Sequence, residues 1–168
     1  MNALERRNKI LQRLSSADVA ISATALAREF SVTRQVIVGD IALLRAQGHD
    51  ISATPRGYVI PAAAIGPVHQ IACIHSEDQT QAELNAIVDC GCTVLDVIVE
   101  HPVYGQLTAP LQISSRYDVE QFLQKMHDAA PLSALTEGIH LHTISCPNED
   151  VFAHLKEMLH HLGILLAE

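Results

Sequence analysis

Two histidines near the C-terminal end have the type and spacing of a metal-binding pair. His140 and His142 alternate with apolar residues in the run GIHLHTISC, which spans residues 138–146. The alternation predicts a strand, and alternate side chains of a strand share one face. The two imidazoles can therefore converge on a single ion.

Two further side chains are candidates to complete such a site. His75 closes an apolar run, which we expect to be a strand, and Glu83 follows in a predicted helix. Three imidazoles and one carboxylate suit a borderline divalent ion such as Zn, Ni, Fe or Co. This interpretation requires the strands 68–76 and 138–146 to be neighbours. Otherwise the histidines are polar strand residues without a common ligand.

The four cysteines offer a softer alternative. In a reducing compartment we interpret Cys73, Cys90, Cys92 and Cys146 as small, buried, apolar residues. A thiolate site built from Cys90 and Cys92 is the alternative. A structural zinc site needs a second pair of ligands, and the sequence has none close to Cys90 and Cys92.

The charges divide the chain into a basic end and an acidic body. The net charge of the 168 residues is −8, yet residues 1–61 hold eight Lys and Arg against five Asp and Glu. Residues 62–168 hold three Lys and Arg against fourteen Asp and Glu. This asymmetry indicates two tasks. The proline-bounded stretch PAAAIGP marks the joint, so we predict domains at 1–61 and 67–168.

The sequence gives no sign of a membrane segment. Apolar runs stay well short of the ~20 residues that cross a bilayer, and MNALERRNKI lacks the apolar core of a signal peptide. We expect a cytoplasmic protein that does not contact membranes.

The basic end has the element order of a winged helix-turn-helix. Three helical patterns precede HDISATPRGYVI, which reads as a hairpin. The third helix of such a module enters the major groove, where polar side chains meet base edges. The expected DNA contacts are Thr33, Arg34, Gln35 and Arg45, with Arg56 at the hairpin tip. Further basic residues are expected at phosphates: Arg6, Arg7, Lys9 and Arg28.

The segment LSSADVAISATALAREFSVTRQVIVGDIALLRAQGHDISATPRGYVI closely resembles the winged-helix module of many bacterial repressors. Where those proteins often carry polar or basic residues, the third helix has Val38 and Gly39. We therefore expect fewer base contacts from its middle. The alternative is a helical domain whose arginines are merely solvated.

The acidic body reads as β-α-β-β-α-β-α. This order predicts an α+β fold, a two-layer sandwich with helices on one face of an antiparallel sheet. Ser115 and Asp118 have the spacing of a capping box at the second helix, and Asn148 precedes the last helix as its cap.

Residues from about 67 to 165 resemble the three-histidine (3H) domain. Its marks are a histidine ending the first strand, an acidic residue eight positions on, an EHPVYG stretch and a final H-x-H. Here these are His75, Glu83, residues 100–105, and His140 with His142. Together with the winged helix, almost the whole chain resembles the niacin-responsive repressors of NAD biosynthesis and niacin uptake.

The resemblance implies several properties. The 3H fold is similar to that of the histidine-containing phosphocarrier protein, with first and last strands side by side. The family's metal ligands carry over as His75, Glu83, His140 and His142. Nicotinic acid is the implied corepressor, and its candidate contacts are His101, Tyr104 and Arg116. A homodimer on a palindromic operator is the expected assembly.

Two other functions remain open from the residues alone. One is a metal-dependent hydrolase with Glu100 as general base, but four protein ligands fill a tetrahedral zinc site, so we expect no enzyme. The other is a repressor for which the ion itself is the signal. The identity of the ion, the operator and the preferred acid are not encoded in these patterns.

Overall fold

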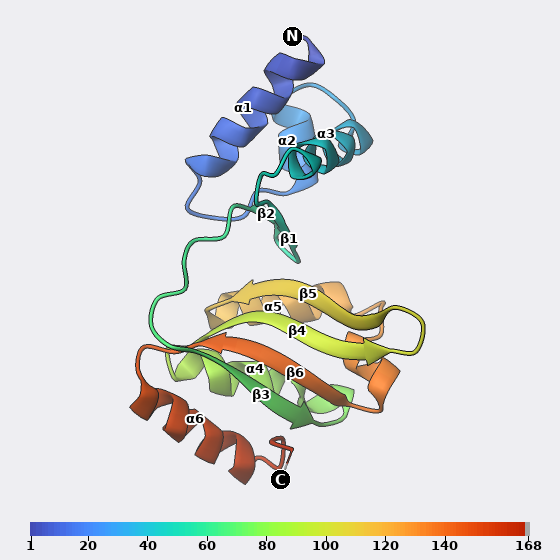
Figure 1. Ribbon diagram of the computed structural model, residues 1–168. Coiled ribbons are helices and arrows are strands. Elements are labelled where there is room, and N and C mark those ends of the chain that lie inside the picture. Colours follow the sequence, from blue (N-terminus) through green and yellow to red (C-terminus); the bar gives the residue numbers. More distant parts are fainter. Residues whose placement is uncertain (167–168) are drawn as a thin grey trace. The chain divides into compact units, whose positions relative to one another are not determined.

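The protein consists of two compact units with separate cores (Figure 1). The computed structural model describes residues 1–166, with one unit spanning Met1–Ala62 and the other beginning at Ala63. The first unit is helical with one hairpin, and the second builds an antiparallel sheet with helices. The predicted α+β class is confirmed.

The N-terminal unit has the predicted helix-turn-helix order and ends in a hairpin. Its elements are α1 (Ala3–Ser15), α2 (Ala23–Glu29), α3 (Arg34–Ala46), β1 (Ser52–Thr54) and β2 (Gly57–Val59). Hydroxyl groups set the helix starts, because Ser22 accepts a hydrogen bond from the Ala25 N–H and Thr33 accepts one from the Val36 N–H. The Thr33 hydroxyl therefore caps the first turn of α3.

The core of this unit departs from the expected pattern at α3. Ile37, Ile41 and Leu44 are buried, at the spacing of one helix face. Val36 and Leu43 are also apolar, yet both are exposed. The buried face also includes a carboxylate, because Asp40 is only 4% exposed.

The second unit follows the predicted order of strands and helices. Its elements are β3 (Val68–Ile74), α4 (Thr80–Asp89), β4 (Thr93–His101), β5 (Gly105–Ile113), α5 (Arg116–Met126), β6 (Ile139–Ser145) and α6 (Glu149–His161). Short 3-10 turns, η1 (Glu77–Gln79) and η2 (Leu132–Thr136), precede α4 and β6. The Ser115–Asp118 capping box and the Asn148 cap are both present, as predicted.

The sheet places the first and last strands of this unit side by side. Its order is β3-β6-β4-β5, and all pairings are antiparallel. Cys73 of β3 lies opposite His140, and Ile71 lies opposite His142. The adjacency that the metal interpretation required is therefore confirmed.

One face of the sheet carries the core and all three helices. Ile71 and Cys73 of β3 and Ile144 of β6 pack with buried residues of the helices, namely Leu84, Ile87, Val119, Leu155 and Leu159. Opposed residues on paired strands share a face, so His140 and His142 also point to the helix side. This orientation brings both imidazoles to α4.

Candidate metal centre and DNA-binding surface

Glu83 is the point at which the three predicted histidines meet. One carboxylate oxygen of Glu83 lies 2.7 Å from His75 Nε2 and 3.4 Å from His142 Nε2. The other oxygen lies 3.0 Å from His140 Nε2. All four residues are buried. The structure thus brings together the four residues that the sequence singled out.

Each ring is oriented by a backbone carbonyl on its far side. The Nδ1 atoms of His75, His140 and His142 lie 2.8 Å from the carbonyl oxygens of Ser76, Gly138 and Asp96, respectively. A carbonyl oxygen only accepts, so each Nδ1 carries the hydrogen. In the neutral rings every Nε2 then presents a lone pair to the carboxylate. Such a cluster of acceptors requires protons or a cation, and its N and O donors fit a divalent transition metal.

In the metal-free protein, protons fill this role. Burial opposes the charge on Glu83, but His142, His140 and His75 outweigh it, so the pKa of Glu83 lies well below its usual range. Burial also opposes charge on His75 and His142, and Glu83 outweighs it, so the pKa of both imidazoles is raised. A bound cation would replace these shared protons.

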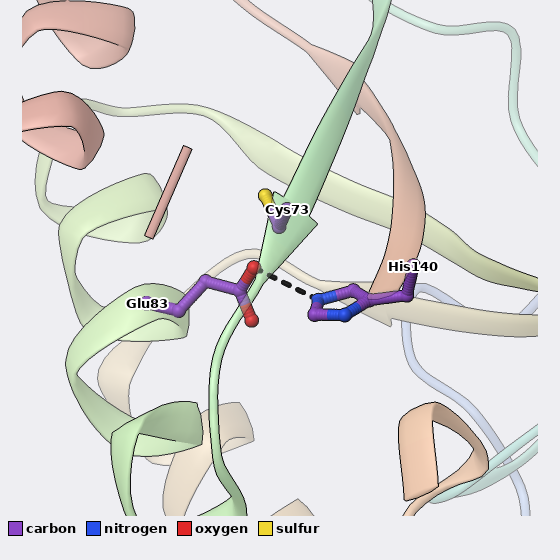
Figure 2. Close-up of side chains that lie close together, drawn as sticks. All are labelled: Cys73, Glu83 and His140. Atoms are coloured by element: carbon purple, nitrogen blue, oxygen red, sulfur yellow. Dashed lines mark hydrogen bonds and ion pairs between the residues drawn. The ribbon is translucent and has the colours of Figure 1, made fainter. Parts of the chain in front are cut away.

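A cysteine also lies beside the carboxylate. Figure 2 shows Cys73 near Glu83 and His140, with a hydrogen bond between the Glu83 carboxylate and the His140 ring. The ligand atoms of these three buried residues all lie within 4.8 Å of one another. Burial and then the neighbouring Glu83 raise the pKa of the Cys73 thiol. Our interpretation of Cys73 as an apolar core residue overlooked this neighbourhood, because an isolated cysteine in a strand gives no spacing signal.

The C-x-C alternative finds no support in the described part of the chain. Cys90 Sγ lies 3.5 Å from the sulfur of Met158, and Cys92 Sγ lies 2.9 Å from Cys146 Sγ. The two side chains thus have different partners. Within residues 1–166, one group of three potential ligand residues has all its ligand atoms within 4.8 Å of one another, namely Cys73, Glu83 and His140, and it includes neither Cys90 nor Cys92.

Gly138 shapes the cluster through its backbone. Its φ of +92° lies in the left-handed region, and a Cβ at this position would lie 2.3 Å from the carbonyl oxygen of His75. Its own carbonyl accepts hydrogen bonds from His140 Nδ1 and from the backbone N–H of His75. The glycine that opens GIHLH therefore allows β6 to approach His75 closely.

The three predicted effector contacts lie at two different ends of the sheet. His101 ends β4 and Tyr104 lies in the turn to β5, both at the same end as His75, and His101 Nδ1 accepts from the N–H groups of Val103 and Tyr104. Tyr104 is 76% exposed. Arg116 follows Ile113, which pairs with Val94 at the opposite end.

Arg116 is already paired in that position. Its guanidinium contacts the Asp89 carboxylate at 2.8 and 2.5 Å. This ion pair joins the start of α5 to the end of α4. The structure therefore does not bring Arg116 to the histidine cluster, and a contact to an effector bound there is inconsistent with this position.

The candidate DNA-binding residues divide into exposed and structurally engaged groups. Arg34 and Gln35 are exposed in the first turn of α3, whereas the Thr33 hydroxyl caps the helix. Arg45 Nε donates to the carbonyl of Ile51 at 2.6 Å, so this side chain ties α3 to the hairpin. Arg56 is partly exposed in the hairpin turn. The strongest candidates for base contacts are Arg34 and Gln35.

Two arginines of α1 are paired with a carboxylate inside the N-terminal unit. Arg6 contacts the buried Asp40 of α3 at 2.6 Å, and Arg7 lies 3.6 Å from the same carboxylate. The expectation that both residues meet phosphates took no account of this partner. Their pairing anchors α1 against the helix that carries Arg34 and Gln35.

Comparison with known proteins covers both units. The 3H domain family matches residues 68–168, and a family described as an HTH domain matches residues 6–59. The chain is 43% identical over 169 residues to the "Transcription repressor NadR" of Bacillus subtilis (strain 168), covering 97% of this chain and 94% of that protein. It belongs to this family of transcription repressors.

A second relative is also described as a transcription repressor. The "Probable transcription repressor NiaR" of Thermotoga maritima is 40% identical over 166 residues, covering 98% of this chain and 95% of that protein. These relatives are regulators and not enzymes, so the prediction of no enzyme activity is confirmed. Among the described residues, no helix is long and apolar enough to span a bilayer.

Proposed function

We propose that this repressor binds a palindromic operator in the cytoplasm and that nicotinic acid, bound beside a divalent ion, tightens this binding. The observation that carries the proposal is the buried cluster of three imidazole Nε2 atoms that face one carboxylate, at 2.7, 3.0 and 3.4 Å. That arrangement is satisfied by a cation. Nicotinic acid is the proposed corepressor because the chain resembles the niacin-responsive repressors.

The proposed ligands of the ion are His75, Glu83, His140 and His142. The Nδ1 hydrogen bonds of the three histidines fix each ring before the ion binds, which lowers the cost of ordering the site. Imidazole and carboxylate donors suit Zn, Ni, Fe or Co. An ion with more than four coordination positions would supply one for the pyridine nitrogen or the carboxylate of nicotinic acid.

The effector contacts we favour are His101 and Tyr104. Both lie at the sheet end that also holds His75 and Gly138. An exposed tyrosine ring can stack on a pyridine ring, and the His101 Nε2 atom can bond a carboxylate. Arg116 is the weakest of the three candidates because Asp89 holds it at the other end.

The proposed regulation is a shift between two arrangements of a homodimer. A dimer places two α3 helices about one helical turn apart, ~34 Å, in successive major grooves. Nicotinic acid would raise operator affinity only by its preference for the DNA-binding arrangement, typically about 1–3 kcal/mol or 5- to 150-fold.

Operator binding tests this function. DNA ligands are first selected in vitro by the metal-loaded protein, and their affinity is measured by fluorescence anisotropy with and without nicotinic acid. We expect at least fivefold tighter binding with nicotinic acid and little change with benzoic acid, which lacks the ring nitrogen. Equal affinities in all three conditions contradict the corepressor role.

A metal-sensing repressor is the second candidate. It is favoured by the burial of the cluster, since an ion alone satisfies the inward-facing donors. The same anisotropy experiment separates the two functions. A sensor of the ion responds to metal addition and chelation while nicotinic acid has no effect.

A further inference from the structure

Cys73 occupies a position that the four-ligand site does not use. It lies directly opposite His140 on the neighbouring strand, and its side chain lies on the helix-covered face, near Glu83. Opposed residues of an antiparallel pair have Cβ atoms about 4.5–5.5 Å apart. The thiol therefore lies close both to His140 and to the carboxylate that all three imidazoles contact.

The spacing of the three ligand atoms matches that around one ion. Zn–S bonds are about 2.3 Å and Zn–N or Zn–O bonds about 2.0–2.2 Å, so two ligands of one ion lie at most about 4.5 Å apart. The sulfur of Cys73, a carboxylate oxygen of Glu83 and a ring nitrogen of His140 lie within 4.8 Å of one another. Tetrahedral ligands lie about 3.6 Å apart, so movements of about 1 Å would place the three atoms around one ion.

The other cysteines lie elsewhere. Cys92 precedes β4 and Cys146 follows β6, at the sheet end away from His75, and their sulfurs contact each other. Cys90 contacts the Met158 sulfur. Cys73 alone among the four shares its surroundings with a carboxylate and an imidazole of the cluster.

We propose that Cys73 is a fifth protein ligand of an ion with more than four coordination positions, and that its thiolate makes the site prefer thiophilic ions over hard ones. This inference rests on the metal site proposed above. On binding, the sulfur–metal bond forms and the S–H bond breaks, with the proton leaving to water. A mixed S, N and O donor set favours Zn and Co over Mn or Mg.

Cobalt absorption spectroscopy tests the assignment directly. The full chain is stripped of metal and loaded with one equivalent of Co²⁺. A thiolate ligand produces a sulfur-to-cobalt charge-transfer band in the near ultraviolet, separate from the visible d–d bands that any ligand set gives. We expect this band in the wild-type protein and its loss in Cys73→Ser, with d–d bands still present.

A control with a buried cysteine at the other end of the sheet excludes unspecific effects. Cys146→Ser removes a thiol of equal burial and is expected to keep the charge-transfer band. Should Cys73→Ser fold poorly, Cys73→Val provides a β-branched residue that suits a strand. For either Cys73 variant we expect the preference for Zn²⁺ over Mn²⁺, measured by competition, to fall at least tenfold.

The possible outcomes distinguish this inference from the metal site itself. If d–d bands appear without a charge-transfer band, and His142→Ala abolishes them, the metal site stands and the thiolate ligand is refuted. If the band persists in both Cys73 variants, sulfur from another residue is responsible and the assignment is also refuted. If Co²⁺ gives neither kind of band, the metal site and the inference fail together.

Discussion

A carboxylate oxygen of Glu83 lies 2.7 Å from Nε2 of His75, and both side chains are buried at the junction of β3 and α4. The contact is the shortest of three that join Glu83 to imidazoles. Because a carbonyl holds the Nδ1 hydrogen of each ring, the Nε2 atoms face inward as acceptors unless protonated. A bound cation would turn this mutual repulsion into coordination.

Removal of one imidazole should weaken metal binding strongly. We expect His142→Ala to lower the affinity for Zn²⁺ or Co²⁺ by at least about 100-fold, since loss of even an outer partner of a ligand costs 10- to 100-fold. Calorimetric titration of metal into the stripped protein measures the effect. His154→Ala, which alters an exposed histidine of α6, should bind as the wild type does. Similar affinities of both variants would argue against His142 as a ligand.

Gly138 should be intolerant of a side chain. Gly138→Ala adds a Cβ that meets the His75 carbonyl and adds left-handed strain of about 1–2 kcal/mol. We expect lower thermal stability together with weaker metal binding. Gly163→Ala is the matched control, because Gly163 also has a positive φ of +70° but no atom within 4 Å of the new Cβ. Equal losses in the two variants would show that strain, and not contact with His75, determines the effect.

The metal-free protein should lose stability as the pH rises above neutral. The raised pKa values of His75 and His142 give stability that is complete below their unfolded pKa of about 6.5. This contribution disappears as the pH passes through the folded values. The lowered pKa of Glu83 gives stability above about pH 4.3 that is lost as the pH falls through its folded value. The cluster therefore stabilises the apoprotein most between about pH 4.3 and 6.5.

Metal should reverse this trend near neutral pH. A divalent ion binds the deprotonated Nε2 atoms, so its stabilising effect grows as the pH rises. Thermal unfolding at pH 6 and pH 8, with chelator and with Zn²⁺, measures both trends. We expect the gain in melting temperature upon Zn²⁺ addition to be larger at pH 8. A gain that is larger at pH 6 contradicts the shared-proton description of the cluster.

Arg34 and Gln35 should differ in their effect on DNA binding. An amide that reads adenine contributes about 1–3 kcal/mol of base discrimination, so Gln35→Ala should relax sequence preference at one position of each half-site. Arg34→Ala should also relax sequence preference and, because it removes a positive charge as well, reduce the salt dependence of binding. Lys156→Ala removes the same charge from α6 and serves as the control. Parallel binding and selection experiments check the three variants, and wild-type specificity of Gln35→Ala would exclude its role at base edges.

The sequence predicts the fold well where the signal is local or periodic. Ser115 with Asp118 as a capping box and Asn148 as the cap of α6 follow from short-range hydrogen bonds, and both are present. The alternation of His140 and His142 correctly placed both side chains on one face. The adjacency of β3 and β6 came from family resemblance, since residue spacing does not specify which strands pair.

The missed features depend on partners far apart in the chain. Arg6 and Asp40 form a pair across two helices, and Arg116 is held by Asp89. A lone arginine has the same sequence signal whether it meets DNA, an effector or a carboxylate. The surroundings of Cys73 were missed for the same reason. They depend on the pairing of β3 with β6 and on the position of the Glu83 side chain.

Calorimetric titration of nicotinic acid into the metal-loaded and the metal-stripped protein tests the central claim most directly. If the effector binds beside the ion held by His75, Glu83, His140 and His142, the loaded protein should give a one-to-one binding curve. The stripped protein and His142→Ala should show at least about tenfold weaker binding. Nicotinic acid binding of equal affinity with and without metal would contradict the account.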